Sequence, residues 1–79
     1  MDTKQEFMDA VHMGREIEFS YCEQHYFESR HNENDWYIYH EETKYEQHFA
    51  SAYDLLANTM LQGRNINDIW VQITIDCIL

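Results

Sequence analysis

The chain has 79 residues, of which 15 are Asp or Glu and five are Lys or Arg, so its formal net charge at pH 7 is −10. This length is that of one small domain, residues 1–79, and the charge argues against direct binding to nucleic acid because phosphates would be repelled. Aromatic side chains make up 15% of the residues, which predicts a core rich in large rings.

The first predicted element is a helix over residues 4–13. Thr3-Lys4-Gln5-Glu6 has the spacing of a capping box, in which two side chains bond each other's backbone amides. Phe7 and Val11 then share one helix face, and Gly14 stands where a left-handed C-terminal cap is needed. A helix this short is expected to dock its apolar face on the rest of the domain.

After this helix, apolar and polar side chains alternate, which is the pattern of half-buried strands. Asn and Asp residues, which favour tight turns, interrupt the alternation. The predicted strands cover residues 16–21, 26–30, 36–40 and, with a weaker pattern, 45–49. The predicted turns between them lie at residues 22–25, 31–35 and 41–44.

Helical periodicity then returns in a second predicted helix over residues 52–61. Ser51 precedes it with the spacing of a start signal, and Gly63 stands just past its end. Asn65 is expected to cap a single helical turn over residues 66–70.

A last strand is predicted where apolar and polar side chains alternate from residue 71 to residue 77. Strands between two helices are typical of an α+β domain. We therefore expect a small antiparallel sheet of three to five strands with two helices packed on one face, in the order α-β-β-β-(β)-α-β. The predicted core consists of Phe7, Val11, Ile17, Phe19, Ile38, Leu55, Leu56, Ile69, Ile73 and Ile75.

Chemical motifs are weak in this sequence. Cys22-x-x-His25 is the nearest approach to a metal-ligand pair, but zinc sites usually need a second pair and Cys77 stands alone. Cys22 with His25 or His48 would make a nucleophilic pair only if the tertiary structure brought them together. The two glycines lie near helix ends, so no phosphate-binding loop is expected. We predict no catalytic residue, no cofactor, no metal site and reduced cysteines.

The remaining signal is the acidic surface of the strands and turns. Repeated carboxylates would attract a protein with a basic, nucleic-acid-binding surface. The same charge would also serve simply to keep a small aromatic-rich domain in solution. We expect Glu16, Glu18 and Glu28 to face solvent, and we assign Trp36, Tyr37 and Tyr39 to the core rather than to a stacking platform. The predicted partner-binding residues are Glu16, Glu18, Glu23, Glu28, Glu33 and Asp35.

Four segments resemble a group of short uncharacterised proteins of low-GC Gram-positive bacteria and their phages or mobile elements. The resemblance covers most of the chain from residue 7 onward; it implies a compact α+β fold and transfers no known activity. Those proteins often have an Asn-Gly type turn after the first strand, where this chain has Cys-Glu-Gln-His. The segments that carry the resemblance are residues 14–21, 36–38, 54–56 and 69–75.

The sequence thus favours a non-enzymatic acidic interaction protein that binds a basic nucleic-acid-binding protein, as phage-borne inhibitors such as anti-CRISPR proteins and DNA mimics do. The alternative is a domain that acts through a protein interface or as a homodimer, without mimicry. Neither an apolar run of 18 residues nor a signal-peptide pattern occurs in the sequence, so we expect a cytoplasmic protein that does not contact membranes.

Overall fold

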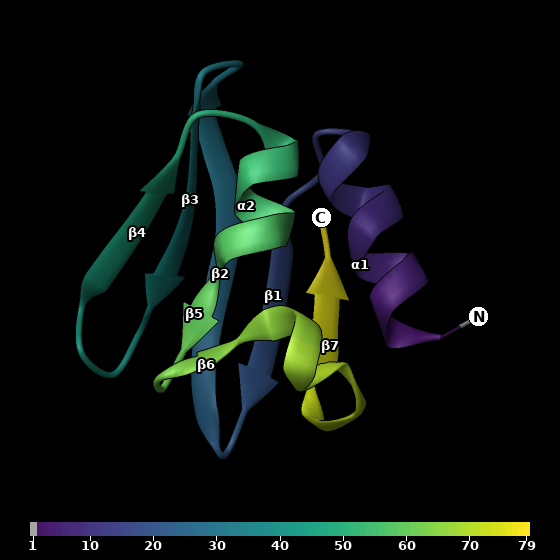
Figure 1. The fold of residues 1–79 in the computed structure, drawn as a ribbon, viewed down its shortest axis with the longest axis vertical. Helices are drawn as coiled ribbons and strands as arrows, with labels where there is room; N and C mark the ends of the chain where they lie inside the picture. Colours follow the sequence, from purple (N-terminus) through teal and green to yellow (C-terminus); the bar gives the residue numbers. More distant parts are fainter. Residues whose placement is uncertain (1) are drawn as a thin grey trace.

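The structure is a computed structural model that describes residues 2–79. Its main layer is a five-stranded antiparallel sheet with the strand order β4-β3-β2-β1-β7. The two helices pack on one face of this sheet (Figure 1). The predicted α+β class and element order are therefore confirmed.

The four strands expected before the second helix are all present, and the weakly patterned one is an edge strand. The sheet consists of β1 (Ile17–Tyr21), β2 (Gln24–Asn32), β3 (Asp35–His40), β4 (Tyr45–Phe49) and β7 (Thr74–Ile78). The other elements are α1 (Thr3–His12), α2 (Ala52–Asn58), the short strands β5 (Met60–Leu61) and β6 (Arg64–Asn65), and the 3-10 turns η1 (Ile66–Asp68) and η2 (Trp70–Gln72).

The β1–β2 hairpin has a two-residue turn. Cys22 and Glu23 both have positive φ, at 49° and 64°. Two consecutive residues with positive φ are the requirement of a type I′ turn, whose twist matches that of paired strands. Neither residue is Gly or Asn, so each adopts the left-handed conformation at a cost of about 1–2 kcal/mol. The turn therefore has the geometry typical of Asn-Gly with a different pair of residues.

Helix α1 begins with a different cap from the one predicted. The carboxylate of Asp2 accepts a hydrogen bond from the backbone N–H of Gln5 at 2.8 Å. The capping box assigned to Thr3 and Glu6 is therefore wrong. Asp is at least as good an N-cap as Thr, and its charge also suits the positive end of the helix dipole. Gly14 has φ 73°, as its position after the helix predicts.

Helix α2 starts as predicted and ends early. The hydroxyl of Ser51 accepts the backbone N–H of Asp54 at 3.0 Å. The helix ends at Asn58 because Thr59 takes an extended conformation, with φ −61° and ψ 128°. The hydroxyl of Thr59 donates to a carbonyl of the last helical turn at 2.7 Å. Residues 59–61 are therefore not helical, contrary to the prediction.

Residues 60–65 instead form the small hairpin of β5 and β6. Gln62 and Gly63 occupy its turn with positive φ, at 51° and 82°. Gly63 thus closes a hairpin and does not end α2. Leu61 is buried in the core, which anchors this hairpin over the sheet.

The segment after the hairpin contains two 3-10 turns. The side chain of Asn65 accepts the backbone N–H of Asn67 at 2.9 Å and caps η1, which confirms the predicted cap, but this turn ends at Asp68 and a second one begins at Trp70, where a single turn over residues 66–70 was expected. The last strand begins at Thr74, later than predicted, because η2 turns Trp70 into the core and leaves Val71 95% exposed. Alternation in residues 71–73 therefore does not mark a strand here.

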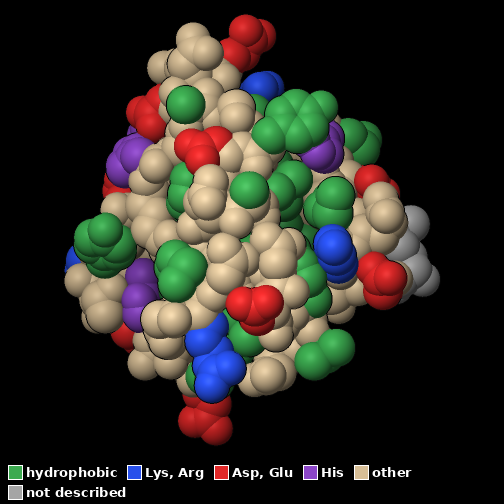
Figure 2. Space-filling model, viewed as in Figure 1, with side chains coloured by type: hydrophobic (Ala, Val, Ile, Leu, Met, Phe, Trp, Pro, Cys, Tyr) green, Lys and Arg blue, Asp and Glu red, His purple; other side chains and the backbone are tan. Residues whose placement is uncertain are grey.

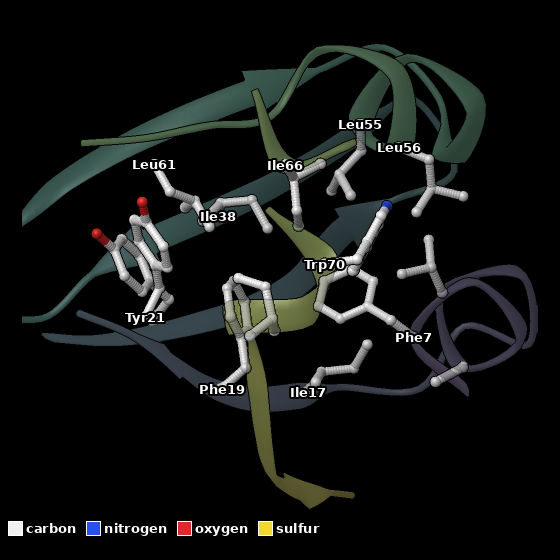
Figure 3. Packing of buried hydrophobic residues seen from close by; sticks show 14 of the residues in the cluster. Phe7, Ile17, Phe19, Tyr21, Ile38, Leu55, Leu56, Leu61, Ile66 and Trp70 are labelled. Atoms are coloured by element: carbon white, nitrogen blue, oxygen red, sulfur yellow. The ribbon is translucent and has the colours of Figure 1, made fainter. Parts of the chain in front are cut away.

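The core lies between the sheet and the helical layer, and Figure 3 shows side chains from both layers meeting in one cluster. Nine of the ten predicted core residues are buried. Ile75 pairs with the buried Phe19 and packs against the core, but it is only partly buried because β7 is an edge strand. The core also includes Tyr26, Trp36, Phe49, Leu61, Ile66 and Trp70.

Candidate functional site

One face of the sheet carries the helices, and the other stays open. In β1 buried and more exposed side chains alternate, with Phe19 buried and Glu18 exposed. Glu18 pairs with Phe27, and Phe27 pairs with Tyr39, so these three side chains lie on the same side of the sheet. We call this side the open face. Its side chains discussed below are Glu16, Glu18, His25, Phe27, His31, Asp35, Tyr37, Tyr39, Glu46, His48 and Asp76.

Aromatic rings cross the middle of the open face. The ring of Tyr37 on β3 stacks on His31 of β2, with 4.6 Å between the ring centroids. It also lies 5.9 Å from the ring of His48 on β4 and 6.5 Å from that of Phe27 on β2. Tyr37, Phe27 and Tyr39 are half-buried, although no helix or strand of residues 2–79 packs over this face. The sheet therefore presents a contiguous apolar stripe to solvent.

Carboxylates flank this stripe on both sides. Glu18 lies on β1 and Glu16 directly precedes that strand, where its carboxylate accepts a hydrogen bond from the hydroxyl of Ser29 at 2.7 Å. Asp76 lies beyond them on β7, and its carboxylate is 3.5 Å from the hydroxyl of Ser20. Glu46 stands on the opposite edge strand, β4. Of the side chains assigned above to the open face, within residues 2–79, none is Lys or Arg. The open face is therefore acidic around an aromatic centre.

His48 is clamped between two of these carboxylates. Its Nδ1 lies 2.8 Å from Oδ1 of Asp35, and its Nε2 lies 2.9 Å from Oε1 of Glu46. The hydrogen bond to Asp35 and then that to Glu46 raise the pKa of His48 above 6.5. A planar imidazole ring held by two carboxylates beside an aromatic ring is thus already part of this face.

A second histidine, His25, bonds a carboxylate at the other end of the sheet. Its Nδ1 lies 2.7 Å from Oε2 of Glu42, and its backbone N–H donates to Oε1 of the same carboxylate at 2.8 Å. The hydrogen bond to Glu42 raises the pKa of His25 above 6.5. The same bonds hold the pKa of Glu42 at about 2. Both groups are at the surface, so this pair orders the β3–β4 turn more than it stabilises the domain.

A hollow of about 490 Å³ lies between these features. It joins the acidic flank on β1 and β7 to the aromatic stripe and to the start of the β3–β4 turn. Its lining residues are Glu18, Phe19, His25, Tyr26, Phe27, Tyr39, Glu41 and Asp76.

The predicted partner-binding carboxylates do not form one patch. Glu16 and Glu18 are exposed on the open face, as expected. Glu23 lies in the β1–β2 turn and Glu33 in the β2–β3 turn, which are at opposite ends of the sheet (Figure 1). Asp35 is half-buried and holds His48. Only part of the predicted set can therefore contact a single partner surface.

The expectation that Glu28 faces solvent is wrong. Its side chain lies on the covered face between Ile17 and Ile38, and it is 0% exposed. Neither carboxylate oxygen has a hydrogen-bond partner within residues 2–79. Burial, reinforced by the charge of Glu16 and opposed by that of Arg30, raises the pKa of Glu28 to about 8. At neutral pH, Glu28 is therefore a protonated member of the core.

The register explains this error. Two aromatic residues, Tyr26 and Phe27, stand side by side before Glu28, so either could point inward. Tyr26 pairs with the buried Phe19 and is itself buried, which places Glu28 on the inner side as well. The assignment of Tyr37 and Tyr39 to the core is also wrong. In β3 aromatic residues occupy both faces, so their type does not show which of them points inward. Trp36 is buried as expected.

The aromatic stripe was therefore the part of the site missed by sequence reasoning. Its signal was the odd-position spacing of Tyr37 and Tyr39 on either side of the buried Ile38. The clamp on His48 has no comparable signal in the sequence, because its two carboxylates come from different strands, Asp35 from β3 and Glu46 from β4.

The cysteines are exposed free thiols, at Cys22 and Cys77. In the part of the chain that the structure describes, no group of three or more His, Cys, Asp or Glu side chains is arranged to hold a metal ion. The ring of His25, the other member of the predicted ligand pair, bonds Glu42 instead.

Comparisons with protein-family models, with curated proteins and with solved structures found no match to this chain. None of the helices in residues 2–79 has the length and apolar character needed to cross a lipid bilayer. The fold and the surface together define a small α+β domain with one uncovered sheet face, acidic at its margins and aromatic at its centre.

Proposed function

We propose that this protein is a non-enzymatic interaction protein whose open face binds a basic surface of a nucleic-acid-binding protein in the cytoplasm. The observation that carries the proposal is the open face itself: an uncovered sheet surface with carboxylates on both sides of an aromatic stripe. A net charge of −10 on 79 residues adds a long-range attraction for a basic partner.

The charge spacing supports partial mimicry of nucleic acid. Glu18 lies on β1 and Glu16 directly precedes this strand on the same side of the sheet, and alternate residues of extended chain are about 6.6 Å apart. Phosphates along one DNA strand recur about every 3.4 Å of helix axis. One row of carboxylates is therefore roughly half as dense as a phosphate row, and the carboxylates of β4 and β7 add to it.

The helix-bearing side of the molecule lacks this concentration. In Figure 2, acidic side chains on that side are scattered among apolar and uncharged ones, with Lys and Arg between them. The Lys and Arg side chains there would repel a basic partner. The open face is therefore the better binding surface.

The proposal includes the role of an inhibitor carried by a bacterial phage or mobile element. An inhibitor of the anti-CRISPR or DNA-mimic kind has to occupy the phosphate-binding surface of its target, and a compact acidic domain does so without chemistry. Within the proposal, the target is a protein that holds DNA or RNA with Lys and Arg.

A second role is favoured by the aromatic stripe alone. Half-buried rings on an uncovered sheet are also what a homodimer or another apolar protein interface would bury. Such an interface would be insensitive to salt, and sedimentation of the purified protein would show a dimer.

The test is capture of partners from a bacterial lysate by the immobilised protein, at low and high salt, followed by competition with DNA. We expect a captured partner that salt releases and that DNA displaces, because exposed charges steer association and are screened by ions. The double variant Glu16→Lys with Glu18→Lys should lose this partner.

The matched control is Glu6→Lys with Asp68→Lys, which makes the same change of net charge at exposed positions outside the open face. We expect this control to retain the partner. A salt-insensitive partner that ignores DNA would refute mimicry, and equal loss in both variants would show that only net charge matters.

A further inference from the structure

We propose that the open face selects arginine over lysine, with a guanidinium group seated in the hollow between the rings of Phe27 and Tyr39 and the carboxylates of Glu18 and Asp76. This inference rests on the proposed function and names the chemistry of its partner. The occupant is an arginine-bearing segment of a basic protein.

The strand register builds the seat for this group. Glu18 on β1 pairs with Phe27 on β2, and Phe27 pairs with Tyr39 on β3. Side chains that pair directly across strands lie about 4.5–5.5 Å apart at their Cβ atoms. A carboxylate and two rings therefore stand in one row across three strands, along the wall of the hollow of about 490 Å³.

Two more carboxylates complete the rim. Asp76 enters from β7 and Glu41 from the β3–β4 turn. Glu18, Asp76 and Glu41 form no ion pair within residues 2–79, whereas the neighbouring His25 is already bonded to Glu42. The negative charge of the hollow is thus available to a ligand from outside.

This combination suits a guanidinium better than an ammonium ion. A guanidinium is planar and weakly hydrated, so it stacks on aromatic faces and still donates two parallel hydrogen bonds to a carboxylate at its edge. The ammonium group of lysine is compact and strongly hydrated and gains less from a ring. A carboxylate in a row with two aromatic rings should therefore bind arginine more tightly than lysine, which a carboxylate alone would not do.

The molecule already places planar nitrogen-bearing groups beside aromatic rings at two other places. His48 lies beside the ring of Tyr37 with a carboxylate at each nitrogen. The guanidinium carbon of Arg30 lies 5.1 Å from the centroid of the Trp36 ring. The Tyr37 end of the stripe is therefore occupied by the protein's own imidazoles, which leaves the Phe27 and Tyr39 end for a partner.

Two acetylated peptides of equal length and charge, one of alternating glycine and arginine and one of alternating glycine and lysine, provide the test. Titration at low salt by calorimetry gives their affinities, and amide NMR shifts locate the site. We expect the arginine peptide to bind about two- to fivefold tighter, the ratio that corresponds to the roughly 0.5–1 kcal/mol of an exposed cation–π contact. The largest shifts should fall on Glu18, Phe27 and Tyr39.

Tyr39→Leu removes a ring without changing the charge. It should abolish the preference for arginine while leaving the affinity for the lysine peptide unchanged, and Phe27→Leu should do the same if Tyr39→Leu fails to fold. Tyr53→Leu, at an exposed tyrosine of α2, is the matched control and should behave as the wild type.

Equal affinity of the wild type for the two peptides would overturn the inference and leave the proposed function standing. A preference that persists in a folded Tyr39→Leu variant would also overturn it. Binding of neither peptide at low salt would overturn both, because a basic partner could then not be held by this face.

Discussion

The two faces of the sheet treat a charged side chain in opposite ways. On the covered face, Glu28 is buried between Ile17 and Ile38 and has no hydrogen-bond partner within residues 2–79. On the open face, His48 is exposed and yet has a carboxylate at each ring nitrogen. Burial is therefore decided by register, since a residue shares the face of its neighbours two positions away, whether or not its chemistry suits that face.

The two faces also have different roles, since the covered face stabilises the fold and the open face offers a surface for binding. The covered face contributes buried apolar area and therefore determines whether the domain folds. The open face contributes charges and half-buried rings, whose removal leaves the fold intact but changes what the surface attracts. Matched substitutions on the two faces test this division.

The largest contrast is expected between two phenylalanines. Phe19 is fully buried on the covered face, whereas Phe27 is half-buried on the open face. Phe19→Ala should lower the free energy of unfolding by about 3–5 kcal/mol, and Phe27→Ala by about 1 kcal/mol. Urea denaturation measures both, with Phe19→Leu as a milder substitute if Phe19→Ala does not fold. Equal losses would contradict the assignment of the two faces.

Glu28 should make the domain less stable as the pH rises. Its pKa is about 8 in the folded state and 4.5 for an unperturbed carboxyl group, so between these values the folded state binds more protons than the unfolded state. Stability should therefore fall from pH 4.5 to pH 8, by up to about 1.4 kcal/mol per pH unit, and this contribution should be constant above pH 8.

Glu28→Gln should remove this pH dependence, and Glu28→Leu should raise the stability at pH 8 by about 1–4 kcal/mol, because an uncompensated charge is replaced by an apolar group. Glu18→Gln, on the open face, is the matched control and should change the stability by less than about 0.5 kcal/mol. Thermal melts from pH 5 to pH 9 measure all three. A Glu28→Gln curve parallel to that of the wild type would show that Glu28 does not titrate in this range.

The clamp on His48 should be visible in a titration. Because Asp35 and Glu46 raise the pKa of His48, its ring protons should titrate above pH 6.5 in NMR spectra. Its contribution to stability should be complete below pH 6.5 and lost as the pH rises through the folded pKa. Asp35→Asn should move the midpoint back toward 6.5, and an unmoved midpoint would contradict the clamp.

His25 provides the smallest effect, because the pair with Glu42 lies in solvent. Glu42→Gln should lower the pKa of His25 toward 6.5, since the hydrogen bond with Glu42 is the main cause of the raised value. The melting temperature should hardly change. A large loss of stability would mean that the β3–β4 turn depends on this pair.

The periodicities of 3.6 and 2 were sufficient to place both helices, the meander of strands and most of the core. They did not determine the exact ends of elements, which depend on local conformation: Asp2 caps α1 in place of Thr3, and α2 ends because Thr59 is extended. The position of Glu28 depended on which of two adjacent aromatics pairs with Phe19, and that is set across strands. The carboxylates of the candidate site were identifiable by type, whereas their grouping on one face required the register.

The place of β7 beside β1 determines an order of events in folding. Strands β1 to β4 follow one another through short turns, so each pairing closes a small loop, whereas β7 joins β1 from the far end of the chain. Closing a long loop costs more entropy than closing a short one, and contacts distant in sequence form late. We expect the meander to assemble first and β7 to dock last. Amide hydrogen exchange should accordingly be faster in β7 than in β2, and transient opening would expose the edge of β1 as a strand free to pair with another chain.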